Sequence, residues 1–166
     1  QSRNEDGSWK RYDADWREST YKNYFWMVPY DLQGLIDSIG GKEAAEKRLD
    51  EMFRRLDASY GDEWFASGNE PSFQIPWIYN WAGAPYKAQQ VIRRILNEQY
   101  NSRVNGLPGN DDLGSMGAWY VFASIGLFPE IPGVGGFSVN SPVFRKIVLH
   151  LPEGDVIIKG GDEKKE

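Results

Sequence analysis

Residues 105–119 read NGLPGNDDLGSMGAW, a glycine-rich turn that opens directly onto an apolar run. Glycine and proline set backbone angles that most residues avoid, so the adjacent carboxylates Asp111 and Asp112 are predicted to lie on a tightly specified loop. The apolar run predicts a helix that begins at Asp111 or Asp112. The side chains expected on its inward face are Met116, Trp119, Tyr120 and Ala123.

Amphipathic helices are also predicted upstream of this loop. Asp31 is expected to cap a helix that ends at the glycine pair 40–41, and a second helix is predicted over residues 42–56. Residues 77–83 have helical spacing, and Pro85 fits the first position of a helix that ends near Tyr100. The predicted apolar faces are Leu32, Leu35, Ile36 and Ile39, then Ala45, Leu49, Met52, Phe53 and Leu56, then Ala88, Val91, Ile92, Ile95 and Leu96.

The pattern changes after Gly126, where prolines and glycines interrupt all helical spacing. Residues 137–139, 146–151 and 155–159 are predicted as short strands, and the tail 160–166 as a solvated end. The predicted fold is therefore mainly α, made of helical hairpins, with a small C-terminal β element and a join near residue 130.

Composition excludes several classes of function. A chain of 166 residues with 40% hydrophobic residues is long enough for a real core. A net charge of −5 argues against nucleic-acid binding, and no apolar run approaches the roughly 20 residues that span a membrane. The chain has no cysteine and is 14% aromatic, with many aromatics beside Asn, Gln, Asp or Glu. Such a mixture suits the apolar faces and hydroxyl edges of sugars, although it is also typical of an aromatic core.

Motifs for other enzyme chemistry are absent from the sequence. His150 is the only histidine and lies in a predicted strand, without the Cys or the serine motif of a catalytic triad, so a structural role is expected for it. Zinc-protease, phosphate-loop and dinucleotide motifs do not occur. With these motifs absent, the remaining candidate for catalysis is chemistry by carboxylate side chains.

Three carboxylate sites lie at breaks between predicted elements: Glu18, Glu70, and the pair Asp111 and Asp112. In a helical barrel, helix ends on one side converge on one cleft, and two carboxyl groups across such a cleft supply a general acid and a general base. Capping of a helix by the Asp pair and a turn hydrogen bond from Glu70 are the structural alternatives. Spacing alone leaves both interpretations open.

Four long stretches resemble the C-terminal part of glycoside hydrolase family 92, the calcium-dependent bacterial exo-α-mannosidases. They occur in the family's order and cover most of the chain: NEDGSW at 4–9, ESTYKNYFWMVPYDLQGLIDSIGG at 18–41, GNEPSFQIPWIYNWAGAPYKAQ at 68–89 and GNDDLGSMGAWYVFASIGLFP at 109–129. The resemblance implies an N-terminal β-sandwich and an α/α six-barrel, with residues 1–130 the C-terminal part of the barrel and 131–166 a short β region with a polar tail.

The resemblance also implies an activity and roles for individual residues. It implies inverting removal of terminal α-linked mannose from glycans, expected to be α-1,2-linked and part of N-glycan degradation, with a Ca²⁺ ion contacting the sugar. Glu18 matches the general acid and Asp112 the general base. Asn69 and Glu70 match a pair that contacts the leaving sugar, and Asn110 and Asp111 are expected to bind substrate beside the base. The aromatic residues after Glu18 are expected to desolvate it partly.

Some features depart from the family pattern. Residues 19–23 and Tyr30 differ from its usual motifs, and Phe73-Gln74 replaces a usual histidine pair, which bears on linkage specificity. The β-sandwich and the first half of the barrel are missing, and the chain starts at Gln1, so an excised or split piece is expected. Its apolar helix faces are expected to be covered by the missing portion or by self-association.

Two readings of function follow. In the first, the chain carries both catalytic carboxylates of a periplasmic or secreted α-mannosidase, a location that only the resemblance implies. In the second, the isolated chain is a non-catalytic carbohydrate-binding or structural module. The isolated chain is expected to be inactive.

Overall fold

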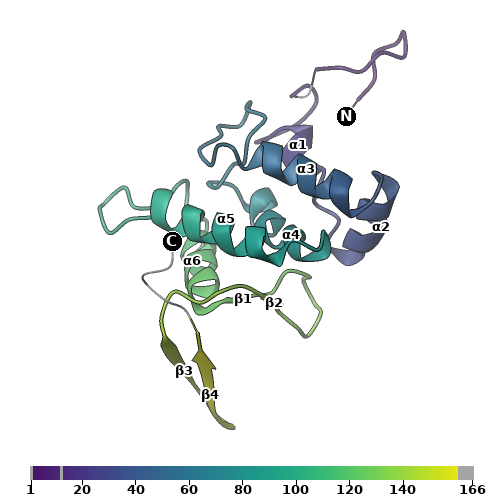
Figure 1. The fold of residues 1–166 in the computed structure, drawn as a ribbon. Helices are drawn as coiled ribbons and strands as arrows, with labels where there is room; N and C mark the ends of the chain where they lie inside the picture. The colour runs from purple at the N-terminus through teal and green to yellow at the C-terminus, as the bar shows by residue number, and fades with distance from the viewer. Residues whose placement is uncertain (1, 12, 161–166) are drawn as a thin grey trace.

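The computed structural model describes residues 2–11 and 13–160 (Figure 1). All helices of the described chain lie between Tyr21 and Ile125, separated by loops, and two small antiparallel sheets follow. The elements, with 3₁₀ turns labelled η, are α1 (Tyr21–Tyr24), η1 (Pro29–Asp31), α2 (Leu32–Ser38), α3 (Lys42–Met52), η2 (Glu70–Ser72), η3 (Ile75–Trp77), α4 (Ile78–Trp81), α5 (Pro85–Glu98), α6 (Ser115–Ile125), β1 (Leu127–Phe128), β2 (Ser138–Val139), β3 (Lys146–Leu151) and β4 (Gly154–Lys159).

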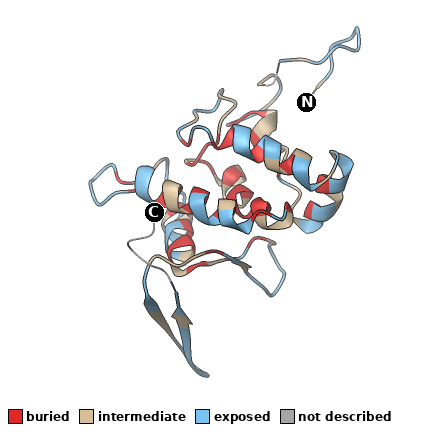
Figure 2. Cartoon of the chain, viewed as in Figure 1, coloured by how far each residue is buried: buried red, intermediate tan, exposed pale blue. Residues whose placement is uncertain are grey.

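The helices pack as consecutive hairpins around one core. α2 packs on α3, α4 contacts both α3 and α5, and α5 packs on α6. The buried side chains line the inner faces of these helices, while their outer faces are exposed (Figure 2). All five apolar side chains predicted for α5 are buried, and Pro85 occupies its first turn as predicted. The mainly α fold with a small C-terminal β element is confirmed.

A polar clamp joins α3 to α5 on the outer side of this core. The ammonium group of Lys87 lies 2.7 Å from Glu46 Oε1 and 2.6 Å from Asp50 Oδ2. The hydroxyl of the buried Tyr79 donates to the other oxygen of Asp50 at 2.9 Å. α3, α4 and α5 are therefore tied together by charge as well as by apolar packing.

The predicted helix over 42–56 is too long. α3 ends at Met52, because the Met52 carbonyl accepts a hydrogen bond from the backbone N–H of Phe65 at 3.2 Å. This partner comes from a distant loop and takes the place of the next helical donor. Phe53 and Leu56 are nevertheless buried, as the stripe predicted. Asp31 caps α2 as expected, with its Oδ1 accepting from Gly34 N–H at 3.0 Å.

The start of the last helix is also corrected. α6 begins at Ser115 and not at Asp111 or Asp112, because Asp112, Leu113 and Gly114 all have left-handed backbone angles. A right-handed helix cannot include such residues. Met116, Trp119 and Ala123 face inward as predicted, whereas Tyr120 is 42% exposed and does not.

The C-terminal strands lie close to their predicted positions. β3 pairs with β4 from Lys146 opposite Lys159 to Leu151 opposite Gly154, and this hairpin projects away from the helices (Figures 1 and 2). β1 was not predicted; it is two residues long and pairs with β2. His150 contacts Asp155 across the exposed hairpin, and the polar tail after residue 160 lies outside the described residues. Within the described chain, no helix has the length and apolarity needed to span a lipid bilayer.

Two loops on one side of the helices touch backbone to backbone at Gly68 and Gly109. A methyl group built on Gly109 would lie 2.3 Å from the Gly68 carbonyl oxygen, and one on Gly68 would lie 2.5 Å from the Pro108 carbonyl oxygen. Real side chains never approach so closely. Glycine at both positions therefore allows the loop before η2 to lie against the loop before α6.

Gly109→Ala is expected to destabilise the fold by about 1–3 kcal/mol, the usual cost of inserting a methyl group where no space exists. The free energy of unfolding from urea titration measures this effect. Gly61→Ala is the matched control, because a methyl group there meets nothing within 4 Å and the backbone angle is not left-handed. A loss at Gly61 as large as that at Gly109 would contradict the role assigned to the contact.

Candidate active site

Glu18 lies just before α1 in a backbone conformation that most residues avoid. Its φ angle is +64°, in the left-handed region. For a residue with a side chain this conformation costs about 1–2 kcal/mol. The Glu18 carbonyl accepts a hydrogen bond from Asn69 Nδ2 at 2.7 Å, across 51 residues of sequence. The segment before η2 therefore holds Glu18 in place, and Asn69 itself is buried.

Asp112 lies on the second loop, also with a left-handed backbone, at φ +45°. Its neighbour Asp111 caps α6: Asp111 Oδ1 accepts from Gly117 N–H at 2.9 Å, and its carbonyl accepts from Ser115 N–H at 2.8 Å. Residue spacing had left two roles open for Asp111 and Asp112, helix capping and catalysis. Asp111 performs the capping, and the Asp112 carboxyl is left for other contacts.

The carboxyl groups of Glu70 and Asp112 meet between the two loops. Glu70 is the first residue of η2, and its Oε1 lies 3.1 Å from Ser115 Oγ at the start of α6. The pKa of Asp112 is raised above its ordinary value, most of all by a hydrogen bond with the Glu70 carboxyl. Slight desolvation and the negative charges of Glu70, Glu18 and Asp111 raise it further. Asp112 is therefore more readily protonated than an isolated aspartate.

One buried amide joins the segments that carry Glu18 and Glu70. Asn23, in α1, is fully buried; its Nδ2 donates to the Trp64 carbonyl at 3.0 Å. Its Oδ1 accepts from Ser72 Oγ at 3.0 Å and from Ala66 N–H at 3.4 Å. α1 is thereby fixed to η2, so the segments on which Glu18 and Glu70 lie are positioned together.

The surroundings of Glu18 differ from the sequence prediction. Trp16 stacks on Tyr24 with ring centres 5.2 Å apart, but the aromatic cluster does not bury Glu18, which is exposed. Burial, and then the charge of Glu18, raises the pKa of Tyr24, so this hydroxyl lies within the electrostatic reach of Glu18. Glu18 is accordingly open to solvent and to a ligand.

Two polar groups beside Glu18 were not predicted from the sequence. Trp16 Nε1 and Ser19 Oγ are buried and have no hydrogen-bond partner among the described residues. Burial of a donor without a partner is costly, which makes both groups notable here. No sequence pattern distinguishes them, because their lack of a partner depends on packing. Asn110, by contrast, is exposed.

The expected calcium ion finds no acidic cluster here. Among the described residues, no group of three or more His, Cys, Asp or Glu side chains lies close enough together to hold a metal ion. Glu70 and Glu18 act electrostatically on Asp112 without forming such a cage. The acidic residues of the described chain thus do not form a Ca²⁺ site by themselves.

The carboxylates lie on an open surface and not inside a cavity. A cavity of about 230 Å³ between α1 and α3 and a broader hollow of about 910 Å³ near Trp81 and Asn140 are lined by other residues. Glu18, Glu70 and Asp112 place carboxyl groups from separate segments beside one solvent-accessible region. Such an arrangement supports general acid–base chemistry.

The chain is similar to known glycoside hydrolases in both sequence and structure. Residues 1–166 match the family model "Glycosyl hydrolase family 92 catalytic domain". A curated relative, an uncharacterized secreted glycosidase of Arthroderma benhamiae, is 32% identical over 139 residues, which is 81% of this chain and 17% of the relative. A solved family GH92 alpha-mannosidase from Bacteroides thetaiotaomicron is 35% identical with a TM-score of 0.79. That match covers 95% of this chain and 22% of the mannosidase.

A second solved structure from the same bacterium is described as a family GH92 inverting mannosidase. It is 32% identical with a TM-score of 0.79, over 95% of this chain and 25% of that protein. The chain therefore spans about a sixth to a quarter of the length of these relatives. The relatives have an α/α barrel, and the helical hairpins seen here are part of such a barrel.

The raised pKa of Asp112 can be tested without any substrate. Carboxyl-carbon NMR titration is expected to give Asp112 a pKa above the ordinary aspartate value of about 3.9. Glu70→Gln should lower it, because the substitution removes the neighbouring negative charge and leaves an amide that donates to the Asp112 carboxylate.

Asp62 is the internal control for this titration. Hydrogen bonds from the Ser59 backbone N–H and hydroxyl lower the pKa of Asp62, and Glu70→Gln should leave it unchanged. An Asp112 pKa at or below the ordinary value, or one that does not respond to Glu70→Gln, would show that the two carboxyls do not interact.

Proposed function

The chain belongs to glycosyl hydrolase family 92, and we propose that it contributes both reacting carboxylates of an exo-α-mannosidase. The substrate is a mannose-containing oligosaccharide, and the reaction removes its terminal α-linked mannose. The names of the solved relatives, an alpha-mannosidase and an inverting mannosidase, support this substrate class.

The observation that carries the proposal is the convergence of carboxylates from distant segments on Asp112. The Glu70 carboxyl and the charge of Glu18 both act on Asp112, and hydrogen bonds link the three segments across 51 and 45 residues. Both proposed catalytic residues have left-handed backbones. Strained conformations of this kind persist where the surrounding structure enforces them, and they cluster at functional sites.

In the proposed mechanism, Asp112 is the general base and Glu18 the general acid. The Asp112 carboxylate takes a proton from water as the water oxygen bonds to the anomeric carbon. Glu18 gives its proton to the glycosidic oxygen as the bond between that oxygen and the anomeric carbon breaks. The water attacks from the face opposite the leaving sugar, so the configuration inverts. The charges of Glu70 and Glu18 bring the pKa of Asp112 closer to neutral pH, which strengthens it as a base.

The remaining polar residues are proposed to bind the sugar. Asn69 and Glu70 lie between the acid and the base, where they are placed to contact the leaving sugar. Asn110 is exposed and lies two residues before Asp112 in the chain. Asp111 fixes the same loop to α6, because its Oδ1 accepts a hydrogen bond from Gly117 N–H. We assign the preference for α-1,2 linkages and for N-glycans to these contacts.

Other properties of the protein are proposed on the same basis. Residues 1–130 form the C-terminal part of the barrel, and residues 131–166 form a β region with a polar tail, although β1 and β2 pair across that boundary. The curated relative is described as secreted, which supports an extracytoplasmic location. Because the chain spans about a quarter or less of its relatives, further sequence or a second copy is proposed to cover its outer faces.

One observation favours the second reading for the chain in isolation. Glu18 and Asp112 are both exposed, so solvent screens their charges and no wall excludes water from the region between them. The 166-residue chain alone is accordingly expected to bind sugar without hydrolysing it.

Glu18→Gln and Asp112→Asn, made in the full-length protein that carries this chain, should each lower kcat/KM on mannobiose by about 10²–10⁴-fold. With a dinitrophenyl mannoside, Glu18→Gln should recover most of its rate, because this leaving group departs without a proton. Asp112→Asn should remain slow on both substrates. NMR of the first product should show the β-anomer of mannose.

Glu43→Gln, on the exposed first turn of α3, is the matched control for these carboxyl-to-amide changes and should have wild-type rates. Wild-type turnover in Glu18→Gln or Asp112→Asn would refute the assignments. An α-anomer as the first product would refute inversion.

The pH dependence of kcat/KM tests the base separately. Asp112 must be ionised to accept a proton, so its raised pKa moves the acidic limb of the profile to higher pH than an ordinary aspartate would give. Glu70→Gln removes the main cause and should move that limb to lower pH. A limb that stays in place or moves to higher pH in Glu70→Gln would contradict the role of Asp112.

A further inference from the structure

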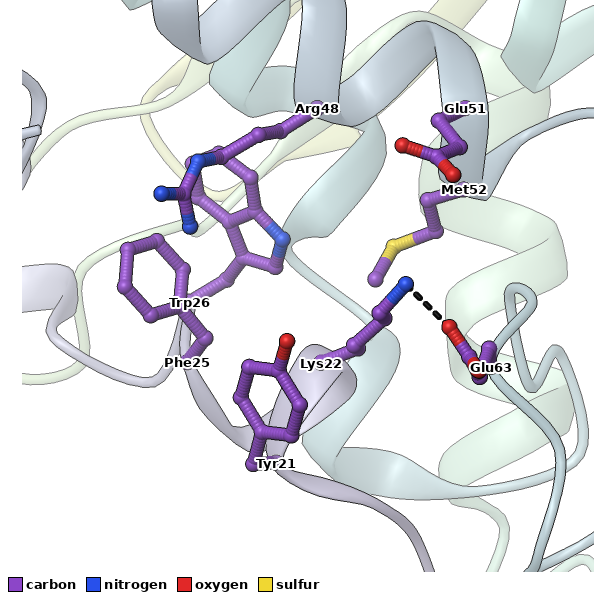
Figure 3. A pocket seen from close by; sticks show the side chains of 8 residues that line it. All are labelled: Tyr21, Lys22, Phe25, Trp26, Arg48, Glu51, Met52 and Glu63. Carbon is purple, nitrogen blue, oxygen red and sulfur yellow. Dashed lines mark ion pairs between the residues drawn. The ribbon is translucent and has the colours of Figure 1, made fainter. Parts of the chain in front are cut away.

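A separate cavity of about 230 Å³ lies between α1 and α3 (Figure 3), and none of the three carboxylates lines it. Tyr21, Phe25 and Trp26 come from α1 and the residues that follow it, whereas Arg48 and Glu51 come from α3. We name this cavity, which Glu63 borders on its third side, the α1–α3 pocket. Pockets for drug-sized ligands measure about 300–1,000 Å³, so this one has room for a single small ring.

Aromatic rings form one wall of the α1–α3 pocket. Phe25 and Trp26 meet edge to face with ring centres 5.1 Å apart, and the Arg48 guanidinium lies 5.0 Å from the centre of the Phe25 ring. In Figure 3 the Arg48 side chain extends beside both rings. Such a wall is rigid and offers apolar contact to the C–H face of a ligand.

The indole nitrogen of Trp26 is directed into the cavity without a partner. Trp26 is only 2% exposed, and its Nε1 points toward the open side between Tyr21 and Met52 (Figure 3). Nothing in the described chain accepts a hydrogen bond from this N–H. An indole N–H is a donor only, and in Figure 3 this one faces the open side of the cavity, where a ligand can reach it. The pocket therefore offers the Trp26 N–H as a hydrogen-bond donor to an oxygen atom of a ligand.

The charges around the α1–α3 pocket are balanced. Lys22 forms an ion pair with Glu63, and Glu51 also acts on the Lys22 ammonium. Burial works against the charge of Lys22, but the hydrogen bond to Glu63 raises its pKa, so Lys22 stays charged. With Arg48, the pocket has two cations and two anions. Neither an anion nor a cation is favoured, whereas hydroxyl groups find both donors and acceptors.

We infer that the α1–α3 pocket binds one neutral pyranose ring, a sugar unit of the glycan that is not cleaved. The inference rests on the proposed function, because Tyr21, which lines the pocket, follows the proposed acid Glu18 by only three residues on the same segment. The ring lies with its C–H face against the aromatic wall, one of its oxygens accepts from Trp26 Nε1, and its hydroxyls donate to Glu51.

Titration of the 166-residue chain with methyl α-mannopyranoside, followed by ¹H–¹⁵N NMR of the indole groups, tests the inference. The Trp26 Nε1–H resonance should shift saturably, and its loss in Trp26→Phe identifies it. Glu51→Gln and Arg48→Met should weaken binding at least threefold. Glu43→Gln, elsewhere on α3, should leave binding unchanged. These surface variants keep the test decisive if Trp26→Phe does not fold.

The control ligands and the catalytic variants separate this inference from the proposed function. Inorganic phosphate should not shift the Trp26 resonance; a phosphate shift without a sugar shift would overturn the inference. Glu18→Gln and Asp112→Asn should bind methyl α-mannopyranoside normally. In the full-length protein, Glu51→Gln should raise KM for mannotriose but not for an aryl mannoside. Mannosidase activity without a Trp26 shift refutes the pocket alone, whereas a Trp26 shift without activity refutes only the mannosidase.

Discussion

The backbone contact between Gly68 and Gly109 is the constraint on which the candidate site depends. The loops that carry Glu70 and Asp112 approach so closely that neither glycine has space for a methyl group. Their carboxyl groups can meet only because the main chains meet first. Core packing of α5 and α6 brings these loops to the same side of the molecule, but the glycines set how close they come.

Buried side-chain amides also position the segments of the candidate site. The amide of Asn23 makes hydrogen bonds with the loop over residues 64–66 and with η2, and Asn69 bonds to the backbone of Glu18. A buried amide that loses its partners costs about 1–3 kcal/mol, so these bonds define one arrangement strongly. They also maintain the left-handed backbone at Glu18. The buried hydrogen bonds of Asn23 and Asn69 thus fix the position of Glu18, although Glu18 itself is exposed.

The sequence predicted those features that depend on local pattern. The stripe of α5 and the cap of Asp31 on α2 follow from spacing and side-chain chemistry within a few residues, and both are present. The end of α3 was not predictable, because the group that ends it is the Phe65 N–H from a distant loop. The predicted start of α6 was wrong for a related reason. The residue preferences of Asp112 and Leu113 do not indicate the left-handed backbone angles that both adopt.

The candidate site divides in the same way. Spacing marked Glu18, Glu70 and the Asp pair as carboxylates at breaks, and family resemblance ordered them. Neither could assign capping to Asp111 alone, since that depends on which carboxyl reaches Gly117. The exposure of Glu18 and the unpartnered Trp16 Nε1 and Ser19 Oγ likewise depend on three-dimensional packing. Sequence identified the chemical groups, whereas packing decided their environments.

The start of α6 brings two opposing electrostatic influences together at this site. A helix carries about half a positive charge at its N-terminus, and Glu70 lies there, with its Oε1 3.1 Å from Ser115 Oγ. A single helix end would favour ionised carboxyl groups around it. The pKa of Asp112 is nevertheless raised, by its hydrogen bond with Glu70 and by the negative charges of Glu70, Glu18 and Asp111. At Asp112 the crowding of acidic groups therefore outweighs the field of the helix.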